Sequence, residues 1–214
     1  MDDLLKLKPI DLTLPLRTGM RGYHYDTVNT VANHGWNARL LHIYSHAGTH
    51  MDAPLHFEAT EETIDQYPVS RFFGKAWLAK VPLNKPGQLI EVDHLGEVKE
   101  HFQPGESLLL ETQWSQYVGE SKYRDEMPRI SVGLANWCVE NKVNMLGVEP
   151  PSVADVNNME ELTQIHQILL KGRVIIIEGL TNLGAITGNQ VILVALPLKI
   201  TGGDGAPARV IAFE

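Results

Sequence analysis

The sequence has very little cysteine. Cys138 is the only one among 214 residues. A single thiol cannot form an intrachain disulfide, so a disulfide-stabilised scaffold is excluded. The lack of thiolate ligands also argues against a purely structural zinc site, which usually contains several of them.

Long hydrophobic runs and an excess of positive charge are also missing. The apolar runs 174–177 and 191–198 are far too short to span a bilayer, and residues 1–8 lack the apolar core of a signal peptide. With 18 Lys and Arg against 26 Asp and Glu, the net charge is −8 and the pI about 5.6. Such a chain has no broad attraction to nucleic acid or anionic membranes. We therefore expect a cytoplasmic protein with neither partner.

The composition is otherwise that of a globular protein, with 43% hydrophobic and 21% charged residues. The length favours one domain over residues 1–214. Strand and helix patterns are mixed without strict alternation, which predicts a layered α/β or α+β fold. We expect strands at 10–16, 38–45, 76–81, 108–111, 143–148, 173–177, 191–198 and 209–213; helices at 93–101, 131–141 and 158–172; and loops at 17–36, 114–129 and 202–207.

Potential metal ligands are concentrated in one short segment, 46–56. Four such side chains occupy even positions and would leave the same face of an extended chain: His46, His50, Asp52 and His56. Fully extended, the segment would span roughly 33 Å, so it must fold back to bind one ion. Gly48 and Pro54 are suitable bend points and disfavour a helix. A strand that runs into a loop is predicted.

A polar loop with histidines present by chance is the alternative for this segment. One histidine would fit that explanation, but three histidines and an aspartate within eleven residues favour a metal or catalytic site.

Two later residues are further candidates. His166 lies beside the apolar stripe of the helix that Asn158 caps with Glu161 as a capping-box partner, so it is either a boundary residue or a ligand. Glu178 ends a strand that is β-branched on both faces. A carboxylate there needs a partner, either a metal ion or an arginine.

Several other residues have two interpretations each. Glu149 ends a buried strand and is either near the site or a surface carboxylate. In the predicted loop 17–36, Tyr23, Tyr25 and Trp36, with His24 and His34, either line a substrate pocket or anchor an exposed loop. Asp204 and Arg209 are interpreted as structural residues near the site.

The segment 46–56 resembles the His-x-Gly-Thr-His-x-Asp-x-Pro-x-His signature of the cyclase family, which includes bacterial kynurenine formamidase and isatin hydrolase. Every fixed position matches. The resemblance implies a swivelling β/β/α domain, a homodimer and five metal ligands, with Asp52 as a bridge if two ions bind: His46, His50, Asp52, His166 and Glu178. Kynurenine formamidases typically carry a Trp-Pro-Gly-Asp element that this chain lacks, so the substrate stays open.

Imidazoles and carboxylates suit Zn²⁺ best and Mn²⁺ or Fe²⁺ acceptably. Such an ion activates water and polarises a carbonyl, and His56 would carry the proton to a leaving nitrogen. The prediction is hydrolysis of a small-molecule amide, by resemblance N-formylkynurenine. The alternatives are a cyclic amide such as isatin, a lactone, or a metal-binding module without turnover. A binding module needs neither a spare base at His56 nor a pocket.

Overall fold

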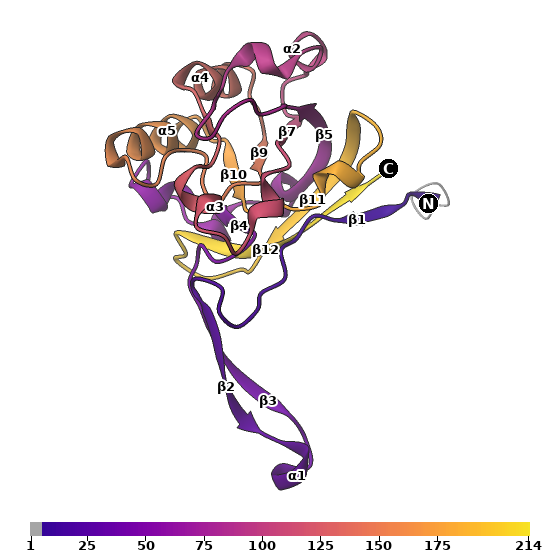
Figure 1. Cartoon of the computed structure of the whole chain (residues 1–214), viewed down its shortest axis with the longest axis vertical. Helices are drawn as coiled ribbons and strands as arrows, with labels where there is room; N and C mark the ends of the chain where they lie inside the picture. The colour runs from indigo at the N-terminus through magenta and orange to yellow at the C-terminus, as the bar shows by residue number, and fades with distance from the viewer. Residues whose placement is uncertain (1–5) are drawn as a thin grey trace.

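The computed structural model describes residues 6–214, so most of the N-terminal segment considered above lies outside it. Its main element is an eight-stranded sheet in the order β1-β12-β11-β5-β7-β9-β10-β4 (Figure 1). These strands are β1 Pro9–Asp11, β4 His50–Asp52, β5 Phe73–Lys80, β7 Ser107–Glu111, β9 Met145–Val148, β10 Ile175–Glu178, β11 Gln190–Pro197 and β12 Gly205–Phe213.

The sheet closes on itself because β4 pairs with β12 as well as with β10. Strands β5, β7, β9 and β10 run parallel, and the remaining pairs are antiparallel. Closure pairs β4 on both sides, so that only the short strand β1 keeps a side without a ladder partner among the described strands of this sheet. It also places the short strand β4 between two partners, both far from it in sequence.

Alternate residues of the central strands enter two separate hydrophobic clusters. In β10, Ile175 and Ile177 join one cluster and Ile176 the other; in β7, Leu109 joins the first and Leu108 the second. This alternation follows from the period of two along a strand. Strands buried on both faces explain the β-branched and leucine-rich runs in the sequence.

Two helices, α4 Val132–Glu140 and α5 Met159–Lys171, cover one face of the sheet. Ser131 caps α4 by accepting a hydrogen bond from the Leu134 backbone, and Asn158 caps α5 through the Glu161 backbone. The side chain of Glu161 does not return to the cap. It accepts a hydrogen bond from Arg129 at 2.8 Å, so the predicted capping box is only half formed.

The remaining elements are short. They comprise α1 Val31–His34, α2 Val98–His101 and α3 Lys122–Asp125; 3₁₀ turns at Pro54–Phe57, Ile64–Gln66, Val69–Phe72, Val92–Leu95, Trp114–Tyr117 and Leu183–Ala185; and the two-stranded pair β6 Leu89–Ile90 and β8 Arg129–Ile130. None of the described helices is both long and apolar enough to cross a bilayer.

The loop predicted for 17–36 is wrong. Residues 23–29 form β2 (Tyr23–Asn29), which pairs with β3 (Ala38–Ile43) in a hairpin that projects from the body (Figure 1). We call β2, α1 and β3 the arm. The mixture of Tyr, Asp, Asn and Val has no clear alternation because neither face of this ribbon packs on the body of the chain.

Smaller corrections have local causes. The helix expected at 93–101 is divided by Gly96, whose φ of +55° leaves the helical region. The expected first strand is only Pro9–Asp11, and β12 begins at Gly205, inside the expected loop. The segment predicted as a loop at 114–129 contains two single turns of helix.

Candidate active site and metal centre

The site is built on β4, whose three residues are fully enclosed by pairing on both sides. His50 lies opposite Glu178 of β10, and Asp52 lies opposite Gly205 of β12. Because side chains alternate along a strand, His50 and Asp52 point to the same side. The antiparallel register therefore brings two carboxylates and an imidazole together in a buried position.

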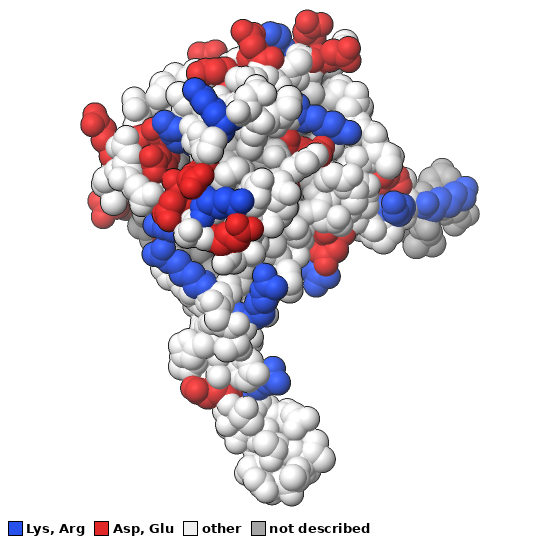
Figure 2. Space-filling view, viewed as in Figure 1, with Lys and Arg blue, Asp and Glu red and all other residues white. Residues whose placement is uncertain are grey.

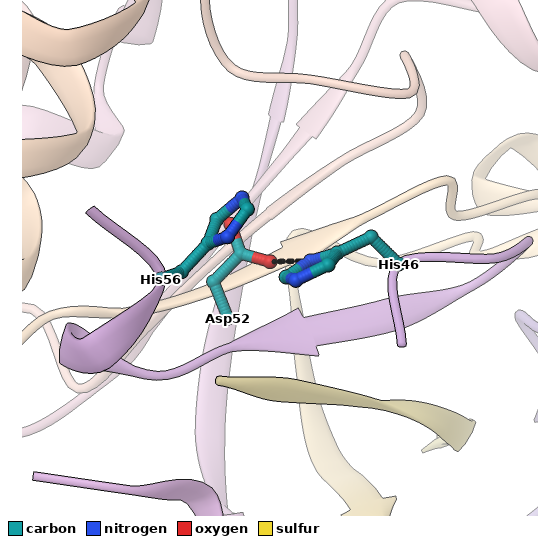
Figure 3. A group of neighbouring side chains, drawn as sticks. All are labelled: His46, Asp52 and His56. Atoms are coloured by element: carbon teal, nitrogen blue, oxygen red, sulfur yellow. Dashed lines mark hydrogen bonds and ion pairs between the residues drawn. The ribbon is translucent and has the colours of Figure 1, made fainter. Parts of the chain in front are cut away.

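His46 reaches the same point from the turn before β4. Gly48 has a φ of +63°, the left-handed conformation that this turn requires. The turn directs His46 back so that its Nδ1 lies 2.8 Å from Oδ1 of Asp52 and its Nε2 lies 2.9 Å from Oδ2 of Asp204. Figure 3 shows the first of these contacts. A Cβ at Gly205 would come within 2.7 Å of the His46 ring, so a glycine leaves room for this imidazole.

His50 and His166 are held in one tautomer. The Nδ1 of His50 donates to the Gly48 carbonyl at 2.9 Å, and the Nδ1 of His166 donates to the Leu162 carbonyl at 2.7 Å. Each ring therefore turns its Nε2 into the site. The Nε2 of His50 lies 3.2 Å from Oε2 of Glu178, and the Nε2 of His166 lies 3.3 Å from Oε1 of the same carboxylate. Both histidines are only 2% exposed. A backbone carbonyl that fixes Nδ1 is the usual support of a metal-binding histidine.

The donor set fits a divalent metal ion. Oδ2 of Asp52 is buried and has no hydrogen-bond partner in the described chain, which is costly for a carboxylate unless a cation lies beside it. Two groups of donor atoms meet within 4.8 Å and share Asp52. They are His46, Asp52 and His56, and His50, Asp52 and Glu178.

The electrostatics of the group support the same interpretation. Burial would lower the pKa of His46, but the hydrogen bond to Asp52 and the charge of that carboxylate raise it to about 9. Burial would raise the pKa of Asp52, yet its contacts with His46 and His50 hold it below the usual value. Without an ion the carboxylates are balanced by protonated imidazoles. A metal ion replaces those protons, because ligating histidines bind in the neutral form.

His56 differs from the other histidines. It follows β4 on the turn Pro54–Phe57, and its ring stacks on His46 with the centroids 3.7 Å apart. In Figure 3 it projects above Asp52. Its side chain is 23% exposed, and its Nδ1 lies 3.6 Å from Asp204. Burial is the main reason why its pKa is lowered, so the ring is neutral near pH 7.

These side chains face a cavity of about 740 Å³, within the range of small-molecule sites. His46, His50, His56, His166 and Glu178 lie on its wall. Apolar and aromatic groups line much of the remainder: Leu14, Met20, Tyr44, Phe57, Val118, Val156 and Leu162. The cavity therefore offers an apolar surface beside a cluster of metal-binding groups.

Glu149 is buried, so its interpretation as a surface carboxylate is wrong. Its carboxylate accepts hydrogen bonds from the Thr112 backbone and hydroxyl, the Trp114 backbone and the Ser115 hydroxyl at 2.7–3.1 Å. It thereby fixes the segment that leads to α3. Tyr123, which lines the cavity, donates to the Glu149 carbonyl at 2.7 Å.

The three aromatic residues predicted to bind substrate lie on the arm. Tyr23 and Tyr25 belong to β2, and Trp36 lies between α1 and β3, where it is 57% exposed. None of them lines the 740 Å³ cavity of its own chain. The arm extends away from that cavity, so their contact with substrate stays a prediction that a second copy of the chain would have to fulfil.

Asp204 and Arg209 were predicted as structural residues near the site, whereas three arginines of the cavity were not predicted from the sequence. Asp204 contacts His46 and is closer to the centre than its structural interpretation implied. Arg209 instead pairs with Asp11 at 2.8 Å on an exposed edge. Three arginines also line the cavity: Arg17, Arg21 and Arg124. Neither a motif nor a periodicity marks these residues; only the Asp-Gly loop around 204 gave a signal.

The Cyclase family model matches residues 10–155, most of the chain. The chain belongs to the Cyclase family. The kynurenine formamidase of Salinibacter ruber is 30% identical over 175 residues, which cover 82% of this chain and 79% of that protein. The family assignment made from the segment 46–56 is thus confirmed.

Solved structures of Cyclase-like proteins share the fold. Isatin hydrolase A from Labrenzia aggregata, bound to benzyl benzoate, superposes with a TM-score of 0.89 at 20% identity, covering 97% of this chain and 93% of that one. A predicted metal-dependent hydrolase from Bacillus stearothermophilus superposes with a TM-score of 0.76 at 27% identity, covering 97% of this chain and 98% of that one. The predicted mixed α/β fold of the swivelling β/β/α type is confirmed by these neighbours.

Proposed function

We propose that this protein is a metal-dependent amidohydrolase of the arylformamidase type. Its substrate is N-formylkynurenine, which it cleaves to kynurenine and formate in tryptophan catabolism. One observation carries the proposal: two buried histidines, fixed through Nδ1 by carbonyls, turn Nε2 toward Glu178 and Asp52 on the wall of a small-molecule cavity. The kynurenine formamidase relatives support the choice of bond.

Five side chains would hold the metal: His46, His50, Asp52, His166 and Glu178. Zn²⁺ suits this set best and Mn²⁺ is acceptable, with one or two ions per chain. Asp52, which belongs to both groups of donor atoms, would be the bridge if two ions bind. When bound, the ion polarises the substrate carbonyl and lowers the pKa of water.

His56 is the proton carrier in this proposal. It is neutral near pH 7 and partly open to the cavity, so it can accept a proton and then deliver it to the leaving nitrogen. Stacking on His46 and the edge contact with Phe57 orient its ring. Asp204 faces Nδ1 of His56 and favours the protonated form that arises during turnover. The apolar wall around Phe57 and Leu162 holds the aryl ring and excludes water.

Hydrolysis of a cyclic amide such as isatin, or of a lactone, is the second candidate. The isatin hydrolase folds favour it, and the missing Trp-Pro-Gly-Asp element is consistent with it. A metal-binding module without turnover is the third. It leaves the cavity and the open side of His56 without a role.

The test combines metal analysis with a substrate panel. Protein purified without chelator is expected to contain one or two equivalents of a transition metal and to hydrolyse N-formylkynurenine faster than isatin or a lactone. Less than half an equivalent of metal, with no gain on adding Zn²⁺ or Mn²⁺, would remove the metal site. Faster hydrolysis of isatin would favour the second candidate, the cyclic amide or lactone hydrolase. Bound metal without turnover of any substrate would favour the third, the metal-binding module.

We also infer that the chain, one domain over residues 1–214, forms a homodimer in the cytoplasm through the arm. A two-stranded hairpin is only marginally stable alone in water. This one exposes more than half of Val28, Leu40 and Leu41, as well as Trp36. A second copy of the chain is the partner that would cover this surface.

Light scattering of the wild type and of a Leu40→Ser/Leu41→Ser variant tests the dimer. The wild type is expected at twice the chain mass and the variant as a monomer. A Val69→Ser change removes a similarly exposed apolar side chain outside the arm and serves as the control. A monomeric wild type would overturn the inference.

A further inference from the structure

Three guanidinium groups line the cavity without partners. Arg17 and Arg21 lie on the segment before β2, and Arg124 lies in α3. None of their side chains forms an ion pair or hydrogen bond with another described residue, whereas other arginines of the chain, such as Arg129 and Arg173, do. Figure 2 shows basic side chains gathered where the arm leaves the body.

No acidic side chain of the cavity forms an ion pair with these arginines, although the charge of Asp125 partly offsets the effect of burial on Arg124. Glu120 also lines the wall, but it is paired with Lys122 at 3.3 Å. Asp125 has the amide of Asn157 as a contact at 3.4 Å and is exposed. The wall therefore carries an excess of cationic groups without a salt bridge, although the net charge of the chain is −8.

The surroundings of Arg124 make this excess unfavourable in the empty cavity. Arg124 is half-buried in the wall that also contains Tyr44. Burial lowers the pKa of Arg124, and the like charge of Arg21 lowers it further. Two cations that repel each other in a partly desolvated wall are stabilised when an anion lies between them.

We propose that the arginine cluster, Arg17, Arg21 and Arg124, binds a carboxylate of the substrate at a position away from the scissile amide. Guanidinium groups bind carboxylates through paired, charge-assisted hydrogen bonds. The histidine groups, Glu178 and several apolar residues line the same cavity as the three arginines. A substrate that spans the cavity would place its amide at His56, its aryl group on the apolar wall and its carboxylate at the arginines.

This inference rests on the proposed function and narrows its substrate class. N-formylkynurenine has an amino-acid carboxylate beyond its aryl ketone, whereas isatin is a neutral ring. An arginine cluster therefore favours acidic aryl amides over neutral cyclic amides, and it supplies recognition that the absent Trp-Pro-Gly-Asp element does not.

A binding experiment without turnover tests the cluster. The probes are 4-oxo-4-phenylbutanoate, an aryl ketone with a carboxylate and no amide bond, and its neutral carboxamide, titrated into the metal-loaded protein by calorimetry. The acid is expected to bind the wild type at least about tenfold more tightly than the carboxamide, as for charge-assisted contacts in a partly desolvated site. The preference should decrease as salt is added.

The variant Arg21→Gln/Arg124→Gln should lose that preference and retain its affinity for the carboxamide. Lys99→Gln removes a positive charge from α2, outside the cavity, and should keep the preference. Equal binding of the two probes to the wild type, including no measurable binding of either, would overturn the proposal, as would a preference that persists in the double variant.

Kinetics separate this proposal from the function on which it rests. In the double variant, KM for N-formylkynurenine should rise roughly tenfold or more while kcat for formanilide, which has no carboxylate, stays unchanged. A wild type that hydrolyses neither substrate but prefers the acidic probe would remove the proposed activity and keep the anion site. A wild type that hydrolyses N-formylkynurenine but binds the acid and the carboxamide equally would keep the proposed activity and remove the anion site.

Discussion

Asp52 has the most demanding surroundings of any residue in the chain. One oxygen contacts His46, while the other is buried without a hydrogen-bond partner among the described residues. Four histidine rings and the Glu178 carboxylate surround it within one small volume. Such an arrangement is stable only if the negative charge of the carboxylates is balanced by protonated imidazoles or by a metal ion. In the first case both ring nitrogens carry a proton, whereas in the second the ligating nitrogen is deprotonated.

His56 can be separated from the other histidines by experiment. If it carries the proton and does not bind the metal, His56→Gln should retain metal while the rate of amide hydrolysis falls roughly 10²–10⁴-fold. An activated ester, whose leaving group needs no proton, should be affected much less. Metal stoichiometry and both rates are measured on the same preparation. Loss of metal would make His56 a ligand, as its place beside His46 and Asp52 also allows.

Glu178 and His166, the proposed ligands outside the segment 46–56, have a different expected signature. Glu178→Ala and His166→Ala should each reduce metal retention during dialysis, because removal of either leaves the ion under-coordinated and the opposing group unpaired. The effect should be about 10- to 100-fold or more in metal affinity. His101→Ala, which removes an exposed histidine outside the site, is the control. Wild-type metal content in both variants would make these residues structural.

At the scale of elements, the site depends on the pairing of three strands. β4 supplies His50 and Asp52, β10 supplies Glu178, and the start of β12 leaves space for His46. Hydrogen bonds on both sides of β4 fix its register, and a shift by one residue would turn Asp52 away from the site. The geometry of the site is therefore a property of the closed sheet.

Gly205→Ala tests the contact between β12 and the site. The added Cβ would lie 2.6 Å from the Met51 carbonyl and 2.7 Å from the His46 ring, so the strand or the ring must move. We expect weaker metal binding and a fall in thermal stability, measured by metal titration and calorimetry. Gly133→Ala in α4 meets only ordinary contacts and should be neutral or stabilising. Unchanged metal binding in Gly205→Ala would show that His46 tolerates the displacement.

The elements also show what sequence reasoning could and could not predict. The segment 46–56 is a local pattern, so it could be recognised, and His166 and Glu178 were joined to it by the family resemblance that this segment carries. The positions of Arg17, Arg21, Arg124 and Asp204 depend on closure of the sheet and on an irregular segment, which no local pattern encodes. The arm was missed because its strands pair only with each other, without the burial that produces alternation.

At the scale of the whole molecule, the second hydrophobic cluster encloses the only thiol. Cys138 is fully buried in α4, and burial raises its pKa to about 12. In the unfolded chain the thiol ionises near its ordinary value of about 8.5. The folded state therefore keeps the thiol neutral from pH 7 to 10, and the free energy of unfolding falls as the pH rises from about 8.5, where the unfolded thiol ionises, toward the folded pKa of about 12.

Cys138 should accordingly be unreactive in the native protein. Labelling with iodoacetamide between pH 7 and 9.5 is expected to be slow and nearly independent of pH, since no thiolate forms. In denaturant the labelling should be rapid and should increase with pH around 8.5. Mass spectrometry of quenched samples measures both rates. Rapid native labelling would show that α4 opens readily or that the thiol is accessible.

The strand that closes the sheet, β12, is also the last strand of the described residues. His46 and Asp204 are 158 residues apart in the sequence, and their side chains lie 2.9 Å apart, between Nε2 and Oδ2. The second side of β4 can pair only after β12 has been made. Contacts of such separation form slowly, because a long chain must be ordered first. On the ribosome, a chain that already contains His46, His50, Asp52, His166 and Glu178 still lacks the strand that holds them in register. The candidate site therefore gains its full set of neighbours only after β12 has been synthesised and has paired with β4.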